Sequence, residues 1–239
     1  TMKMDWDNVG LNCGSPSAPV KKILLALDPF EHVCREAVEV GADLLVTHHP
    51  LIFRPWPMVT DDAAICRGLM ELVRHGISHF CAHTNLDCAE GGVNDVLASV
   101  LGLENVSMVA ENEWGMLRCG EVPAQELDTF LAFVKDRLHC QGLRYCNGGK
   151  NVHKVAVGGG ACTGGLYDAI LAGCDTFVAS DAKYNDFWDA QEQGLNLIDA
   201  GHFYTENPVV AILAEKIAAA FPDVEVKISE IHNDCMKYY

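Results

Sequence analysis

The sequence predicts an α/β protein made of two related α/β lobes. Short apolar segments alternate with segments of helical period, which is the pattern of strands joined by helical crossovers. The same order occurs in each half of the chain, and a Gly-x-Asp triplet followed by an apolar strand recurs at residues 41–46 and 173–178. An internal duplication of a βαβαβ unit is the simplest explanation of these observations.

Each half contains three expected strands and two expected helices. In the first half the strands are expected at 22–28, 42–47 and 77–82, and the helices around 34–38 and 65–73. In the second half the strands are expected at 154–158, 173–178 and 195–200, and the helices at 165–171 and 185–193. Helical crossovers imply parallel sheets covered by helices. We expect a first lobe over residues 1–108, an insertion or exchange element over 109–150, and a second lobe over 151–239.

Composition excludes several classes of protein. The formal net charge of −16, from 17 basic and 33 acidic residues, opposes extended nucleic-acid binding. No apolar run approaches the roughly 20 residues of a membrane span, and the start lacks a basic region followed by an apolar one. The 11 cysteines include no CxxC pair, which favours buried, reduced thiols. We therefore expect a soluble, cytoplasmic protein.

Polar clusters follow the expected strands, where ligands collect in open α/β sheets. His48 and His49 come directly after the second strand and can diverge toward two metal ions; the alternative is one exposed histidine beside one capping histidine. Asp87 follows the third strand, after His83, as a candidate metal carboxylate. Its alternative role is to cap a helix that begins near Asn94.

The second half ends its last strand in a similar cluster. His202 and Glu206 are four residues apart, so a helix would place both side chains on one face; the alternative is a surface histidine and a first-turn glutamate. Taken together, the clusters suit two first-row divalent ions with one bridging carboxylate, in a site between the lobes. The expected metal ligands are His48, His49, Asp87, His202 and Glu206.

Two further features have open roles. The glycine-rich segment 158–165 follows a strand, and it can either bring backbone amides close to an anion or allow tight packing of strand and helix. His83 and Asp181 are the candidate catalytic residues because each follows a strand and can carry protons; His83 can instead support the ligands. Lys183 and Tyr184 are lesser candidates for substrate contact.

At this point the motifs resemble a known family. They are, in order, residues 6–11 (Trp-Asp-Asn-Val-Gly-Leu), 47–51, 83–87, 158–165 and 201–206. The sequence resembles the dinuclear-metal proteins named after yeast NGG-one interacting factor three, also described as GTP cyclohydrolase type-two homologues. The resemblance implies the same five metal ligands with Glu206 bridging, and a ring-shaped homo-hexamer built as a trimer of dimers. The segment before Trp6 is shorter than in most members, and Asn185 stands where relatives often have a histidine.

The function expected from these residues is metal-assisted hydrolysis of a small molecule, with a nucleotide as candidate substrate and two ions chosen from zinc, manganese, iron and nickel. A different class is a non-enzymatic metal-binding protein whose ring acts as an interaction scaffold. A phosphoesterase that acts on nucleic-acid ends would use the same site but needs a basic path to it, which the sequence lacks.

Overall fold

The computed structural model describes residues 3–110 and 115–239, which form two compact units. Unit 1 comprises Thr1–Leu86 and Val210–Asn233, and unit 2 comprises Asp87–Val209 and Asp234–Tyr239. These limits differ from the lobes expected from the sequence, at residues 108 and 150. Residues 111–114, within the expected insertion, lie outside the described residues.

Unit 1 contains a five-stranded sheet in the order β1-β4-β3-β2-β11. Its strands are β1 (Gly10–Cys13), β2 (Lys22–Ala26), β3 (Leu44–Thr47), β4 (Ser78–Cys81) and β11 (Glu225–Ile228). The four strands β4, β3, β2 and β11 are parallel to their neighbours, and β1 is antiparallel to β4. The carboxyl ends of β2, β3 and β4 therefore lie at one edge of the sheet.

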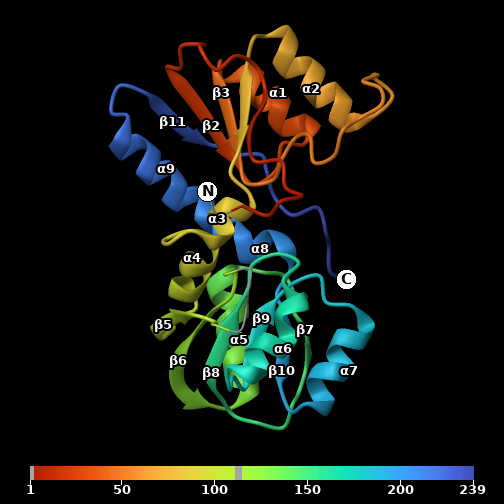
Figure 1. The fold of residues 1–239 in the computed structure, drawn as a ribbon, viewed down its shortest axis with the longest axis vertical. Coiled ribbons are helices and arrows are strands. Elements are labelled where there is room, and N and C mark those ends of the chain that lie inside the picture. The colour runs from red at the N-terminus through yellow and green to blue at the C-terminus, as the bar shows by residue number, and fades with distance from the viewer. Residues whose placement is uncertain (1–2, 111–114) are drawn as a thin grey trace. The chain divides into compact units, whose positions relative to one another are not determined.

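Two helices of unit 1, α1 (Glu31–Glu39) and α2 (Ala64–Arg74), pack side by side (Figure 1). In α1 the apolar residues Val33, Cys34 and Ala37 recur at helical spacing, and all three are buried in one core with strand residues of β2 and β3. Two more helices, α3 (Thr84–Cys88) and α9 (Pro208–Ala220), each contain a point at which the chain passes from one unit to the other, and a third such point lies between Asn233 and Asp234.

Unit 2 contains a six-stranded sheet in the order β5-β6-β8-β9-β10-β7. Its strands are β5 (Glu104–Met108), β6 (Arg118–Gln125), β7 (Arg144–Cys146), β8 (Val152–Val157), β9 (Thr176–Ala179) and β10 (Asn196–Asp199). β8, β9 and β10 are parallel, whereas β6 and β7 pair antiparallel with β8 and β10. The segment expected to be an insertion thus supplies β6 and β7 to this sheet.

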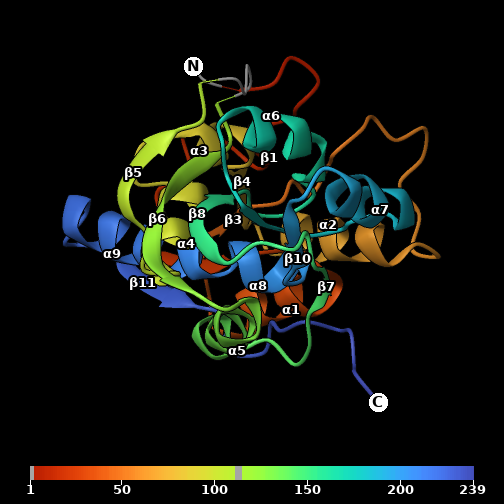
Figure 2. The ribbon, with the colours of Figure 1, turned by 90° about the horizontal axis from the view of Figure 1, so that it is seen from below.

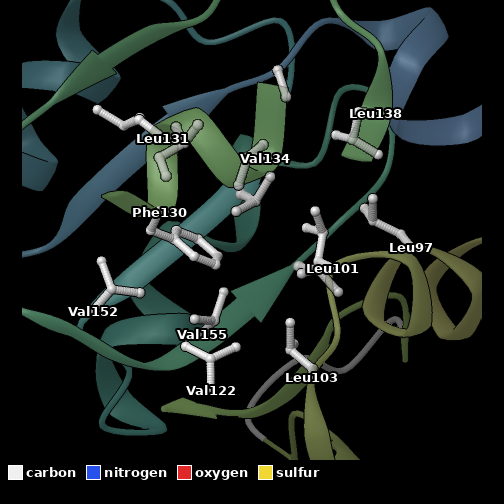
Figure 3. Close-up of a cluster of buried hydrophobic side chains, with 14 of the residues drawn as sticks. Leu97, Leu101, Leu103, Val122, Phe130, Leu131, Val134, Leu138, Val152 and Val155 are labelled. Carbon is white, nitrogen blue, oxygen red and sulfur yellow. The ribbon is translucent and has the colours of Figure 1, made fainter. Parts of the chain in front are cut away.

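Helices cover both faces of the unit 2 sheet. They are α4 (Val93–Val100), α5 (Leu127–Leu138), the 3-10 helix η1 (Thr163–Gly165), α6 (Leu166–Leu171), α7 (Tyr184–Glu192) and α8 (His202–Glu206). Val155 and Val157 of β8 belong to one core with α4 and α5 (Figure 3), whereas Ala156 between them belongs to a second core with α6 and α7. Figure 2 accordingly shows α5 and α6 on opposite sides of β8 and β10.

The predicted duplication is visible in matching hydrogen bonds of the two units. The Asp43 carboxylate accepts the backbone N–H groups of Lys21 and Lys22, and the Asp175 carboxylate likewise accepts those of His153 and Lys154. Each unit therefore fixes the start of its first parallel strand with the aspartate of its Gly-x-Asp triplet.

The lysine at the start of each of these strands also has the same role. Lys22 Nζ donates to the carbonyl of Val40 at 3.0 Å, and Lys154 Nζ donates to the carbonyl of Ala172 at 2.5 Å. Both carbonyls belong to the residue just before the glycine of the triplet. The sequence repeat is thus a structural repeat, and the predicted βαβαβ class is confirmed.

No helix in the described part of the chain is long and apolar enough to cross a membrane. All 11 cysteines lie in that part as thiols, and most are buried, in agreement with the sequence prediction.

Candidate metal centre

In unit 1 the candidate ligands begin where β3 ends. His48 is buried, and its Nδ1 lies 2.8 Å from the carbonyl oxygen of Ala82, just beyond β4. A carbonyl oxygen only accepts hydrogen bonds, so Nδ1 of His48 carries the proton. Nε2 then keeps its lone pair, which is the form of imidazole that binds a metal ion.

His49 is oriented by a carboxylate from the neighbouring strand end. Its Nδ1 lies 2.6 Å from Oδ1 of Asp28, which follows β2, and the other oxygen of Asp28 lies 2.9 Å from Nε2 of His232. Burial alone would raise the pKa of Asp28, but the hydrogen bonds from His232 and His49 outweigh it and lower that pKa. Asp28 is therefore an ionised carboxylate that holds His49 in one orientation.

His83 lies beside these two histidines. One nitrogen from each of His48, His49 and His83 falls within a group whose atoms are all within 4.8 Å of one another. Nδ1 of His83 lies 2.8 Å from Oδ1 of Asp7, and Oδ2 of Asp7 accepts the backbone N–H and the hydroxyl of Thr84. Burial lowers the pKa of His83, although its hydrogen bond to Asp7 raises it. Burial alone would raise the pKa of Asp7, but the hydrogen bonds to His83 and Thr84 lower it. The pair is therefore a neutral imidazole hydrogen-bonded to a carboxylate.

In unit 2 two candidate ligands lie on α8. His202 is its first residue and Glu206 its last, as the spacing of four predicted, and Nε2 of His202 lies 3.0 Å from Oε2 of Glu206. Nδ1 of His202 lies 2.7 Å from Oδ2 of Asp181. Burial alone would lower the pKa of His202, but hydrogen bonds to Asp181 and Glu206 raise it to about 10. The imidazolium proton occupies the position that a cation could take.

Asp87 lies in the first turn of α3 and is buried. One of its carboxylate oxygens lies within 4.8 Å of one from Glu206. Asp87 is not the cap of α4, because the N-cap residue of that helix is Gly92 and no side chain caps it. Instead, the backbone carbonyl of Asp87 accepts a hydrogen bond from Asn94. The capping alternative is therefore wrong, and the carboxylate stands near a second carboxylate, as a cation site requires.

The glycine-rich segment after β8 allows close packing around Glu206. A Cβ atom on Gly160 would overlap Oε1 of Glu206, and the φ of +65° at Gly160 favours glycine. The backbone N–H groups of Gly159 and Gly160 donate to the side chains of Asn94 and Thr205, at 2.7 and 3.0 Å. Because these two amides already donate to protein atoms, the packing role describes them better than an anion cradle.

The donor set fits divalent metal ions. Each of His48, His49 and His202 has its Nδ1 directed at a backbone or carboxylate oxygen, which leaves Nε2 as the ligating atom. Asp87 and Glu206 supply buried carboxylates, whose charge a bound cation would compensate. Such a mixed nitrogen and oxygen set is typical of zinc, manganese, iron and nickel sites.

Sequence reasoning missed the two orienting carboxylates of unit 1, Asp7 and Asp28. Both had a local signal: Asp28 is the last residue of the expected strand 22–28, and Asp7 belongs to the Trp-Asp-Asn motif. Of the lesser candidates, Lys183 precedes α7 and its backbone N–H donates to Asp186, and the Tyr184 side chain is exposed. Asp181, a candidate proton carrier, hydrogen-bonds His202.

Comparison with known proteins decides the family. The family model for Duf34/NIF3 (NGG1p interacting factor 3) matches residues 1–235. The chain belongs to the Duf34/NIF3 family. The resemblance stated from the motifs is thereby confirmed over nearly the whole chain.

Three relatives match nearly the whole chain. A protein of Clostridium perfringens (strain 13 / Type A) named GTP cyclohydrolase 1 type 2 homolog is 34% identical over 99% of this chain and 93% of its own length. The Staphylococcus aureus hypothetical protein SA1388 superposes with a TM-score of 0.92 at 28% identity, covering 100% of this chain and 94% of that one. Reduced HcgD from Methanocaldococcus jannaschii has a TM-score of 0.83 at 29% identity, covering 96% and 92%. The two-sheet α/β fold is thus that of the Duf34/NIF3 family.

Proposed function

We propose that the chain is a hydrolase dependent on two divalent metal ions, of GTP cyclohydrolase type-two-like character. The proposed ligands are His48, His49, Asp87, His202 and Glu206, with Glu206 bridging. One observation carries the proposal: Nδ1 of all three histidines is directed at an oxygen atom, which orients Nε2 for a metal ion.

The residues around the ligands have separate roles in this proposal. When bound, two divalent ions supply a hydrolytic nucleophile near neutral pH and polarise a substrate oxygen or ring nitrogen. Asp28 and Asp181 hold His49 and His202 in their ligating orientations. His83 carries a proton to or from the substrate, because Asp7 holds its Nδ1 and leaves Nε2 to exchange the proton. Asp181 is the second candidate proton carrier.

The proposed substrate is a nucleotide. The Clostridium perfringens relative named GTP cyclohydrolase 1 type 2 homolog supports this class, since it matches 99% of this chain. With a formal net charge of −16 the protein provides little long-range attraction for a triphosphate, so the bound cations would have to supply it. The same charge disfavours a role on extended nucleic acids.

The second candidate function is a metal-binding scaffold without turnover. We propose the homo-hexamer, a trimer of dimers, and the cytoplasmic location for either function.

Turnover separates the two functions. The protein is loaded in turn with zinc, manganese, iron(II) and nickel, and is supplied with GTP while ring opening is followed by ultraviolet absorbance and phosphate release by a coupled assay. We expect turnover with at least one metal, a fall of more than about a hundredfold in Glu206→Gln, and no change in Glu192→Gln, a matched substitution on the exposed side of α7. A wild type that holds metal but turns over no nucleotide would favour the scaffold.

A further inference from the structure

Trp6 and Phe53 form an exposed aromatic pair in unit 1. Their ring centroids are 5.8 Å apart at an interplanar angle of 76°, and Trp6 is 62% and Phe53 41% exposed. Tryptophan gains more than most side chains from burial, and exposed aromatic residues next to reactive groups commonly contact ligands. The pair therefore offers ring faces to a molecule that binds beside it.

The pair lies against the histidines of the candidate centre. Both rings stand edge-on to His83, with centroid distances of 6.3 Å for Trp6 and 6.2 Å for Phe53. His83 in turn has ring centroids 5.2 Å from His48 and 5.5 Å from His49. A planar group stacked on either aromatic ring would thus lie next to the side chains at which hydrolysis is proposed.

Hydrogen bonds fix the backbone on both sides of the pair. Asn8 Nδ2 donates to the carbonyl of Ile52 at 2.5 Å, and the Ile52 N–H donates to Oδ1 of Asn12 at 3.2 Å. Asp7, adjacent to Trp6, is held by Thr84 and His83. Ordering the two segments before a ligand arrives reduces the entropy that binding must overcome. The backbone next to both rings is therefore held in place before a ligand arrives.

Arg54 places a positive charge beside the ring of Phe53. The guanidinium carbon of Arg54 lies 5.5 Å from the centroid of Phe53, and Arg54 is exposed. The guanidinium thus adds a positive charge at the face of Phe53, in a chain with a formal net charge of −16. The two rings and this charge match a ligand that joins a planar ring to an anionic group.

We propose that Trp6 and Phe53 bind the planar heteroaromatic ring of the substrate by stacking, and that Arg54 contacts the substrate's anionic group. This inference rests on the proposed function for the reaction carried out beside the ring. It adds the residues that select a ring-containing substrate over a phosphorylated sugar. Stacking is tolerant of ring identity because every base has a π face, so Trp6 and Phe53 select the class and the neighbouring polar groups select the base.

The test compares two probes that share ribose and phosphate: guanosine 5′-monophosphate and ribose 5-phosphate. Calorimetric titration of the metal-loaded protein should give tighter binding of the nucleotide in the wild type, and roughly tenfold or greater weakening for it in Trp6→Ala and in Phe53→Ala. Ribose 5-phosphate should bind these variants like the wild type, and Trp6→Tyr should restore nucleotide binding. Equal affinity of the wild type for both probes would overturn the inference.

Trp188→Ala is the matched control, because Trp188 is a half-exposed ring of unit 2 that pairs edge-on with Tyr184 at 6.5 Å. It should bind both probes like the wild type, and equal weakening there would overturn the inference. Sedimentation of each variant adds a second readout: if Trp6→Ala changes the assembly and leaves nucleotide affinity intact, the rings contact another copy of the chain instead.

Metal content measured on the same samples separates the inference from the proposed function. A wild type that holds no metal but still prefers the nucleotide would defeat the metal-dependent hydrolase and leave the ring site standing. A wild type that holds metal and shows no preference would defeat the ring site alone.

Discussion

The two units share a βαβαβ scaffold but place nitrogen and oxygen donors on it differently. In unit 1 the strand ends supply the histidines His48, His49 and His83, and carboxylates stand behind them as supports. In unit 2 a single histidine, His202, lies between two carboxylates. Unit 1 thus offers mainly nitrogen donors and unit 2 mainly oxygen donors, and the proposed function needs both kinds.

Equivalent positions exchange roles between the units. His49 lies six residues after Asp43, and Asp181 lies six residues after Asp175, the matching aspartates of the two Gly-x-Asp triplets. In unit 1 this position is a proposed ligand, whereas in unit 2 it supports the ligand His202. The duplicated backbone fixes where a side chain stands, and the side-chain chemistry decides whether it binds or orients.

The two units also differ at the position that follows the first parallel strand, where only unit 1 has a carboxylate. Asp28 lies six residues after Lys22, and Gly160 lies six residues after Lys154. Unit 1 uses this place for the carboxylate that holds its histidine, whereas unit 2 leaves it without a side chain and the carboxylate of Glu206 approaches there instead. Unit 2 thus has no carboxylate at this strand end, and the carboxylate that lies there belongs to Glu206 of α8.

The largest effect we expect comes from Gly160→Ala. The new methyl group would displace Glu206, and we expect metal affinity to fall by more than about a hundredfold, beyond the effect typical of supporting groups. Gly173→Ala is the control, because its φ of +76° imposes similar strain but its Cβ would meet only the end of Lys154 at 3.9 Å. Competition with a chromogenic chelator measures both. Equal losses would mean that backbone strain, and not Glu206, is responsible.

Removing the supporting carboxylate should lower metal affinity more in unit 1 than in unit 2. Asp28→Asn should lower metal affinity by about 10- to 100-fold, because Asp28 is largely buried and holds both His49 and His232. Asp181→Asn should lie at the low end of that range, because the Asp181 side chain is 49% exposed and water can take its place. The same chelator competition ranks them. A larger loss in Asp181→Asn would reverse the comparison.

Acid should weaken the unit 2 part of the centre. The pKa of His202 is raised to about 10, so at pH 7 its imidazole is protonated and metal must displace that proton. Affinity should therefore rise about tenfold for each pH unit between 6 and 8 and fall equally on acidification. Calorimetry in buffers of different ionisation enthalpy counts the proton released. Proton release of zero at pH 7 would contradict the raised pKa.

The smallest effect concerns the repeat itself. Lys22→Met and Lys154→Met each remove one hydrogen bond to the carbonyl before the triplet glycine, so each should lower the free energy of unfolding by about 1 kcal/mol. The loss should be slightly larger at Lys22, which also pairs with Glu225 at 3.1 Å. Urea unfolding measures both. If only one of the two variants loses stability, the two hydrogen bonds share their geometry but do not contribute equally to the free energy of unfolding.

The sequence predicted the strands and helices well where the hydrophobic pattern was local. Apolar runs before His48 and before Asp181 marked buried parallel strands, and the spacing of His202 and Glu206 marked one turn of helix. Local patterns do not state which strands pair across the sheet. The antiparallel addition of β6 and β7 to the unit 2 sheet therefore could not be read from residues 109–150, and that segment was expected to be an insertion.

The sequence indicated the candidate ligands but not the residues that hold them in place. Histidine pairs and strand-end carboxylates are conspicuous in sequence, whereas the contact of His83 with Asp7 joins residues 76 positions apart. The contact of Asp28 with His232 joins residues 204 positions apart. Each aspartate has a local signal in the sequence, but the histidine that it contacts depends on how the chain folds back on itself, and a single sequence carries no signal for that pairing.

The most direct test of the central claim is the metal content of the wild-type protein and of the double variant His48→Ala, Glu206→Ala, measured by plasma mass spectrometry after growth with the four candidate metals. We expect about two divalent ions per chain in the wild type and nearly complete loss in the variant, because each substitution removes a ligand from one part of the centre. A folded wild type without bound metal, or a variant that retains both ions, would contradict the account.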